Sequence, residues 1–151
     1  MFRHIDLKVL ARDLHKRQDS LICKNIGHVF DNYPERKGLC HDNVRLWIKD
    51  HPGDARAFGW LTDRTEEASS SRVRFVAHSI VLTAAGEYLD VTMACGEAEL
   101  PFLIAQITET EFDAIAAPHS ELFFIANDQQ FQEFLHAQTE MLAGSWETSR
   151  D

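Results

Sequence analysis

The stretch VRFVAHSIVLTAAGEYLDVT, residues 73–92, decides how this chain folds. The run from Val73 to Thr83 is rich in β-branched and other apolar side chains, which predicts a long strand. A glycine-containing turn, Ala84-Ala85-Gly86, comes next. Residues Tyr88 to Thr92 then predict a second strand. The sequence therefore predicts a β-hairpin at the centre of the protein.

The register of this hairpin decides whether its histidine and its aspartate, His78 and Asp90, can cooperate. With a three-residue loop and Gly86 in the left-handed conformation, Asp90 lies opposite Ile80 and on the same sheet face as His78. A two-residue loop would place Asp90 opposite Val81 and send the two side chains to opposite faces. We predict the three-residue loop, because an acid among apolar strand residues otherwise has no obvious partner.

Upstream of the hairpin, Cys40 begins a predicted helix that Asp50-His51-Pro52-Gly53 ends. The apolar positions have the spacing of one helix face: Cys40, Val44, Trp47 and Ile48. A thiolate in the first turn is stabilised by free backbone N–H groups and by the helix dipole. The Asp42 carboxylate opposes this effect, so a nearby base is needed to activate the thiol.

The remaining segments predict supporting elements around this centre. In chain order they are a helix from Asp6 to Gln18 capped by Asp6, a helical turn around Ile26 to Phe30, a strand at Ala57 to Leu61, an exposed loop at Thr65 to Ser71, a strand at Phe102 to Ile107, a helix opened by the capping box Thr108 to Glu111 and ending before Pro118, a buried strand at Leu122 to Ala126, and a last helix from Asn127 to Gly144. This pattern predicts an α+β fold.

Length and charge restrict the possible functions. The 151 residues suit one domain, residues 1–151, with residues 145–151 as a flexible tail. The net charge of −9, from 24 acids and 15 bases, offers no basic surface for nucleic acid or for anionic lipid. The opening residues Met1 to Asp6 lack the apolar core of a signal peptide, and no apolar run is long enough to span a bilayer. We therefore expect a cytoplasmic protein, with export by a route without a signal peptide left open.

The three cysteines, Cys23, Cys40 and Cys95, are an odd number at irregular spacing, which favours free thiols over a disulfide framework. Cys23 fits the role of a small buried apolar side chain. Cys40, followed by His78 and Asp90, fits nucleophilic catalysis, which needs a thiolate, a histidine base and a group that orients the imidazole.

Two other interpretations of these residues stay open. A metal site could use Cys40, His41, His78 and Asp90, although an adjacent Cys-His pair lacks the usual spacing of a structural zinc site. Alternatively, the protein is a non-catalytic binding module in which the same residues only pack and form hydrogen bonds.

These segments resemble the transglutaminase-like branch of the papain-like thiol enzymes, in which a cysteine begins a helix and a histidine and an aspartate follow on successive strands. The matching features, in order, are Gly38-x-Cys40, the Gly59-Trp60 strand, and His78 followed by Gly86-x-x-x-Asp90. The segments Arg36 to Asn43 and Tyr88 to Val91 also resemble the active-site segments of arylamine N-acetyltransferases.

The resemblance implies a papain-like fold, with the nucleophile helix packed on a small antiparallel sheet and with flanking helices. It also implies an acyl-enzyme hydrolase or acyltransferase of the amidase, peptidase, deamidase or transglutaminase type. Cys40 would attack the carbonyl of a small-molecule, peptide or protein amide, while His78 shuttles the proton and Asp90 orients His78. The backbone N–H of Cys40 would stabilise the oxyanion. No cofactor and no metal are implied, and the further candidates for contacts with substrate or oxyanion are Asn43, Asn32 and Trp60.

Overall fold

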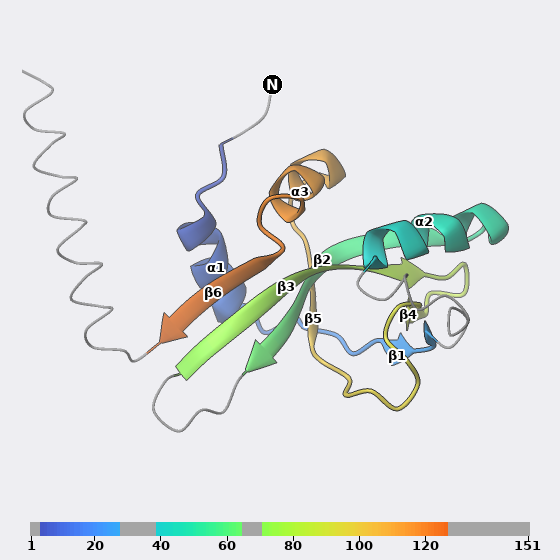
Figure 1. Cartoon of the computed structure of the whole chain (residues 1–151), viewed down its shortest axis with the longest axis horizontal. Coiled ribbons are helices and arrows are strands. Elements are labelled where there is room, and N and C mark those ends of the chain that lie inside the picture. Colours follow the sequence, from blue (N-terminus) through green and yellow to red (C-terminus); the bar gives the residue numbers. More distant parts are fainter. Residues whose placement is uncertain (1–3, 28–38, 65–70, 127–151) are drawn as a thin grey trace, which may run out of the picture.

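The structure is a computed structural model that describes residues 4–27, 39–64 and 71–126. Within these ranges the chain forms one open six-stranded sheet and three helices, which confirms the α+β prediction (Figure 1). The predicted last helix, the tail 145–151, most of the predicted loop at Thr65 to Ser71 and most of the predicted turn around Ile26 to Phe30 lie outside the described residues.

The sheet is built around the long strand β3, Ser71–Leu82. Strand β2, Ala55–Arg64, pairs with β3 antiparallel along its whole length. The other edge of β3 is shared by β6, Glu121–Ala126, and by β4, Tyr88–Asp90. These two strands therefore divide one edge of β3 between them.

Two short strands complete the sheet. Strand β5, Phe102–Ile104, pairs antiparallel with β2, and β1, Lys24–Asn25, pairs parallel with β4. The prediction of a purely antiparallel sheet is therefore wrong at β1. A two-residue strand carries no alternating pattern that sequence inspection could detect.

The hairpin between β3 and β4 has the predicted register. Val81 pairs with Leu89, and this register continues to place Asp90 opposite Ile80. The backbone N–H of Thr83 donates to the Glu87 carbonyl at 2.8 Å, which closes a three-residue loop. Gly86 has φ of 86°, a left-handed conformation that glycine adopts without strain. His78 and Asp90 consequently share a sheet face.

The three described helices pack on the sheet face opposite to the one that carries His78 and Asp90. Helix α1, Leu7–Lys16, begins at the predicted cap Asp6, and α3, Glu109–Ala116, begins with the predicted capping box at Thr108. Both cover a core that includes Trp60, Phe75 and Phe112. Helix α2, Cys40–Asp50, covers the β4 end of β3, where Val44 packs against Val81 and Val91. None of these helices is long and apolar enough to cross a membrane.

The sheet face that carries His78 and Asp90 is covered by irregular segments. Its core contains Cys23, Leu61, Ile80 and Phe102, with Leu21 and Leu100 packed at the margin. Gly59 of β2 faces this side next to His78, and a Cβ atom there would lie 1.9 Å from the Leu103 carbonyl oxygen of β5. Glycine is therefore required for β5 to approach β2.

Three strands differ from prediction in extent or burial. Strand β2 extends beyond the predicted Ala57 to Leu61, and β5 ends at Ile104, three residues short of the predicted Ile107. Strand β6 is predicted to be buried, but among the residues that the structure describes it pairs with β3 alone, and Phe123 is exposed. An apolar run alone does not distinguish a central strand from an edge strand.

Candidate active site

The candidate site lies where β3 passes from one neighbouring strand to the other. Val76 is the last β3 residue paired with β6, and Val81 is the first paired with β4. His78 and Ser79 lie in the interval between them, on opposite faces of the sheet. The first turn of α2 reaches this interval, because His41 hydrogen-bonds to Ser79 and Cys40 interacts with His78.

The His78 imidazole is fixed by Asp90. Its Nε2 atom lies 2.6 Å from Asp90 Oδ2, and both residues are buried. The other carboxylate oxygen, Oδ1, accepts backbone hydrogen bonds from Thr92 at 3.0 Å and from Met93 at 2.9 Å. Asp90 therefore cannot rotate freely, and the Nδ1 atom of His78 is the ring nitrogen that remains for Cys40.

The titration of this pair follows from its surroundings. Burial disfavours the Cys40 thiolate, but hydrogen bonding and electrostatic attraction from His41 and His78 outweigh burial and lower the pKa of the thiol to about 6. Burial likewise opposes the charged form of His78, but Asp90 and Cys40 raise its pKa to about 9. Between these two values the pair is a thiolate and an imidazolium.

Asp90 stays ionised for the same reason. Its burial disfavours the charge, but the hydrogen bond and charge of His78, together with the two backbone N–H groups, lower the pKa of the carboxyl group. The arrangement therefore holds alternating charges in the order carboxylate, imidazolium and thiolate.

A second imidazole, His41, reaches Cys40 from the helix itself. Its Nδ1 atom bonds to the Ser79 hydroxyl and lies 3.3 Å from Nη2 of Arg56. The Arg56 Nε atom also donates to Ser79 Oγ at 2.9 Å. The guanidinium is held in place by Glu109 at 2.7 Å and by Asp113 at 2.9 Å, both on α3.

These contacts favour one tautomer of the neutral His41 ring. A guanidinium can only donate, so a hydrogen bond from Arg56 requires His41 Nδ1 to be an acceptor. Ser79, which accepts from Arg56 Nε, is left to donate its own proton to the same nitrogen. In the neutral ring the proton is then carried by Nε2, the nitrogen that remains available to donate to the Cys40 sulfur. Sequence reasoning considered His41 only as a metal ligand and missed this role.

A cavity of about 280 Å³ opens between α2 and α3; the sequence neighbours of Cys40 line it, but Cys40 itself does not. Leu39 and His41, the two neighbours of Cys40, line it on one side, and Asp113 and Ala117 line it on the other. Leu39 is exposed, and no side chain within the described ranges caps the N-terminus of α2. The backbone N–H groups of the first turn have no partner within the helix, which suits them to stabilise an oxyanion next to Cys40.

The three additional candidates from the sequence have different outcomes. The buried Asn43 amide donates to Thr92 Oγ1 at 3.1 Å, which ties α2 to the segment after β4. Asn32 lies outside the described residues. Trp60 lies on the sheet face opposite His78, against Phe112, because Gly59 pairs with His78 and Trp60 with Ala77.

The metal interpretation gains no support from geometry. Among the described residues, no three His, Cys, Asp or Glu side chains are grouped closely enough to hold a metal ion. Cys40, His78 and Asp90 instead follow one another in a line with His78 in the middle.

Comparison with known proteins assigns the chain to no family. No family model matches it, and no curated protein or solved structure is significantly similar to it. A function for this protein therefore has to be derived from the site itself.

Proposed function

We propose that this protein is a cysteine-dependent acyl-enzyme hydrolase or acyltransferase of the papain-like type that acts on amide bonds. The observation that carries the proposal is the His78–Asp90 hydrogen bond of 2.6 Å, which leaves the second ring nitrogen of His78 to Cys40. The same order of cysteine on a helix, then histidine and aspartate on successive strands, is the basis of the resemblance to transglutaminase-like enzymes.

The proposed first half-reaction forms a thioester. The Cys40 thiolate attacks the carbonyl carbon, a C–S bond forms, and the negative charge moves to the carbonyl oxygen. Backbone N–H groups in the first turn of α2 stabilise that oxyanion. When the intermediate collapses, the C–N bond breaks and His78 gives its proton to the departing amine. His78 is then neutral, and Asp90 still fixes its orientation.

The second half-reaction returns the enzyme to its starting state. Neutral His78 removes a proton from the incoming water or amine, which attacks the thioester carbonyl. The C–S bond breaks, Cys40 leaves as a thiolate, and His78 is again an imidazolium. Water as the acceptor gives a hydrolase, and an amine gives a transferase.

In this scheme, His41 holds the thiolate without taking part in proton transfer. Ser79 and Arg56 occupy its Nδ1 atom, so the imidazole offers the sulfur one N–H donor. We therefore assign His41 as a positioning residue and His78 as the acid and base.

The proposal is tested by trapping the thioester on the intact protein. The full chain is mixed with p-nitrophenyl acetate, nitrophenolate release is followed by absorbance, and the acylated residue is located by peptide mass spectrometry. We expect a burst of about one equivalent with the acetyl group on Cys40, which is the signature of an accumulating acyl-enzyme. The Cys40→Ser and His78→Ala variants should each show no burst.

The exposed thiol of Cys95 is the internal control for nonspecific acylation. Acetylation spread over Cys95 and Cys40 alike, or a burst that survives in Cys40→Ser, would contradict the proposal. A slow, linear release without any acetyl group on Cys40 would favour the non-catalytic binding module.

A further inference from the structure

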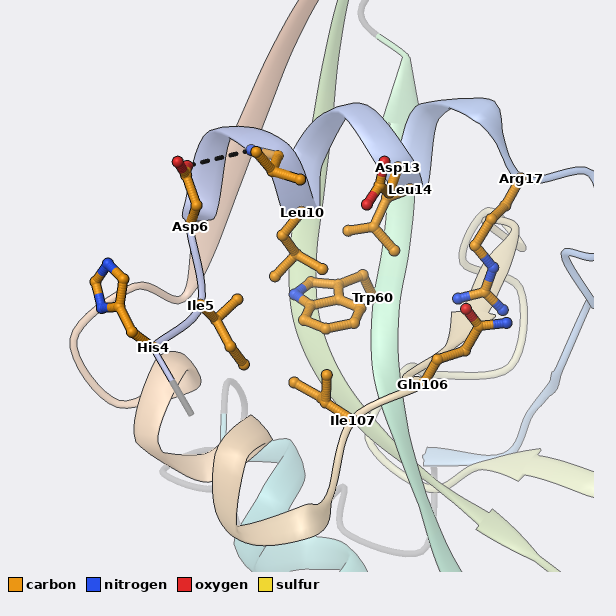
Figure 2. Close-up of a pocket in the computed structure, with 11 residues that line it drawn as sticks. His4, Ile5, Asp6, Leu10, Asp13, Leu14, Arg17, Trp60, Gln106 and Ile107 are labelled. Atoms are coloured by element: carbon orange, nitrogen blue, oxygen red, sulfur yellow. Dashed lines mark hydrogen bonds between the residues drawn. The ribbon is translucent and has the colours of Figure 1, made fainter. Parts of the chain in front are cut away.

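A second cavity, of about 360 Å³, lies on the helix-covered side of the sheet (Figure 2). It is lined by α1, by Trp60 of β2 and by Gln106 and Ile107, which precede α3. It shares no lining residue with the cavity between α2 and α3. The proposed acyl-transfer chemistry therefore does not account for it.

The indole N–H of Trp60 has no hydrogen-bond partner among the described residues, although the side chain is only 1% exposed. Figure 2 shows the nitrogen end of the ring pointing toward Ile5 and Leu10, which line the cavity. Trp47 behaves differently, because its Nε1 atom donates to Asp54 at 2.9 Å. An unpaired buried donor is destabilising, and native proteins contain few of them. A ligand with an acceptor atom would remove that destabilisation.

The other lining residues restrict the charge and polarity of such a ligand. Leu10, Leu14 and Ile107 provide an apolar surface. Arg17 is the only Lys or Arg among the described lining residues, and it is already bound to Asp19 at 2.8 Å and to the Ile104 carbonyl at 2.6 Å. The carboxylates at the rim, Asp6 and Asp13, repel anions. An uncharged ligand with both an acceptor and a donor fits this surface best.

We propose that this cavity binds a small uncharged amide or lactam. The carbonyl oxygen accepts a hydrogen bond from Trp60 Nε1, the hydrocarbon part packs against Leu10 and Ile107, and the amide N–H faces the acidic rim. Because the indole nitrogen is covered in the empty cavity, the side chain of Ile5 or Leu10 has to rotate to admit the oxygen. Ile5 precedes the Asp6 cap and lies outside the helix.

The test uses ε-caprolactam as the probe and the ¹⁵N-labelled full chain as the target. The indole N–H resonance of Trp60 is assigned by its absence from Trp60→Phe and is then followed during titration. We expect it to move downfield and to saturate at about millimolar probe, because a molecule of this size makes few contacts and still loses its translational and rotational freedom on binding. The Trp47 resonance should stay in place, because Asp54 already occupies that donor.

Two comparisons make the result specific. Hexanoate, a carboxylate of similar size, should give no saturable shift. Ile107→Trp adds bulk to the cavity lining while keeping Trp60, and it should abolish the caprolactam shift. The absence of any saturable shift in the folded protein, or an equal shift in Ile107→Trp, would overturn the inference.

A last variant separates this site from the proposed catalytic one. Cys40→Ala should bind caprolactam as the natural protein does, because the two cavities share no residue. Loss of binding in Cys40→Ala would also overturn the inference, since it would show that binding depends on the region around Cys40.

Discussion

Cys23 and Cys40 are both buried, with 4% and 7% of their surface exposed, yet the pKa values of their thiols are shifted in opposite directions. Cys23 packs against apolar side chains, and burial, with the nearby charges of Asp90 and Glu99, raises the pKa of its thiol to about 12. Burial also disfavours the Cys40 thiolate, but His41 and His78 lower the pKa of its thiol to about 6. Burial alone therefore makes a thiol inert, and the adjacent imidazoles make it reactive.

Asp90 influences the pKa of both thiols. Its negative charge helps to raise the pKa of the Cys23 thiol directly. At Cys40 its influence passes through His78, whose positive charge it stabilises. The same carboxylate therefore suppresses one thiolate and supports the other.

The largest expected effect is the difference in alkylation between the two buried cysteines. At neutral pH the thiolate fraction favours Cys40 by roughly 10⁵, and the lower nucleophilicity of a low-pKa thiolate offsets part of this advantage. We expect iodoacetamide to modify Cys40 at least about 100-fold faster than Cys23, as measured by peptide mass spectrometry. Equal alkylation rates for Cys40 and Cys23 would contradict the proposed difference between their thiols.

The next effect comes from removing the base. His78→Ala takes away a hydrogen bond and a positive charge from the thiolate, so the pKa of Cys40 should rise and its alkylation in mildly acidic buffer should slow by roughly tenfold. His51→Ala is the matched control, because His51 is exposed and stacks on Trp47 at the far end of α2. A slowing of similar size in both variants would indicate a general loss of structure.

Asp90→Asn should lower the upper pH limit of the acylation rate. The reactive pair forms when Cys40 loses its proton near pH 6, and it is lost when His78 loses its proton near pH 9. Because Asp90 raises the pKa of His78, its neutralisation should shift the alkaline limb of the acylation rate downward by about one pH unit. An unchanged alkaline limb in Asp90→Asn would show that Asp90 does not control His78.

The smallest effect is expected from the second imidazole. Ser79→Ala removes one donor from His41 Nδ1 but leaves Arg56, so Cys40 alkylation in mildly acidic buffer should slow only about threefold. His41→Gln, whose side-chain amide can still donate to sulfur, should retain more reactivity than His41→Phe. Equal rates in these two His41 variants would contradict the donor role.

Much of the arrangement around Cys40 could be predicted from local patterns. The three-residue loop with Gly86 places Asp90 on the face of His78, and helical spacing places Cys40 in the first turn of α2. Both inferences depend only on residues close in sequence. The roles of Gly59 and Trp60 in the fold were not evident from local patterns, because Gly59 allows β5 to approach β2 and Trp60 packs in the core on the face opposite His78.

The contacts around His41 could not be predicted from local patterns. His41, Ser79 and Arg56 come from three elements, and Arg56 is anchored by α3. Their meeting depends on how α2 docks against the sheet, which no local period encodes. The parallel strand β1 escaped prediction for a related reason, because two residues carry no pattern.

The central claim is that His78 holds Cys40 as a thiolate, and its most direct test is the pH dependence of Cys40 alkylation. Iodoacetamide rates are measured by peptide mass spectrometry from mildly acidic to alkaline pH in the natural chain and in His78→Ala. We predict a half-maximal rate near pH 6 in the natural chain, an upward shift in His78→Ala, and an unreactive Cys23 throughout. A Cys40 rate that rises only above about pH 8, as for an ordinary thiol, and that is unchanged in His78→Ala would contradict the claim.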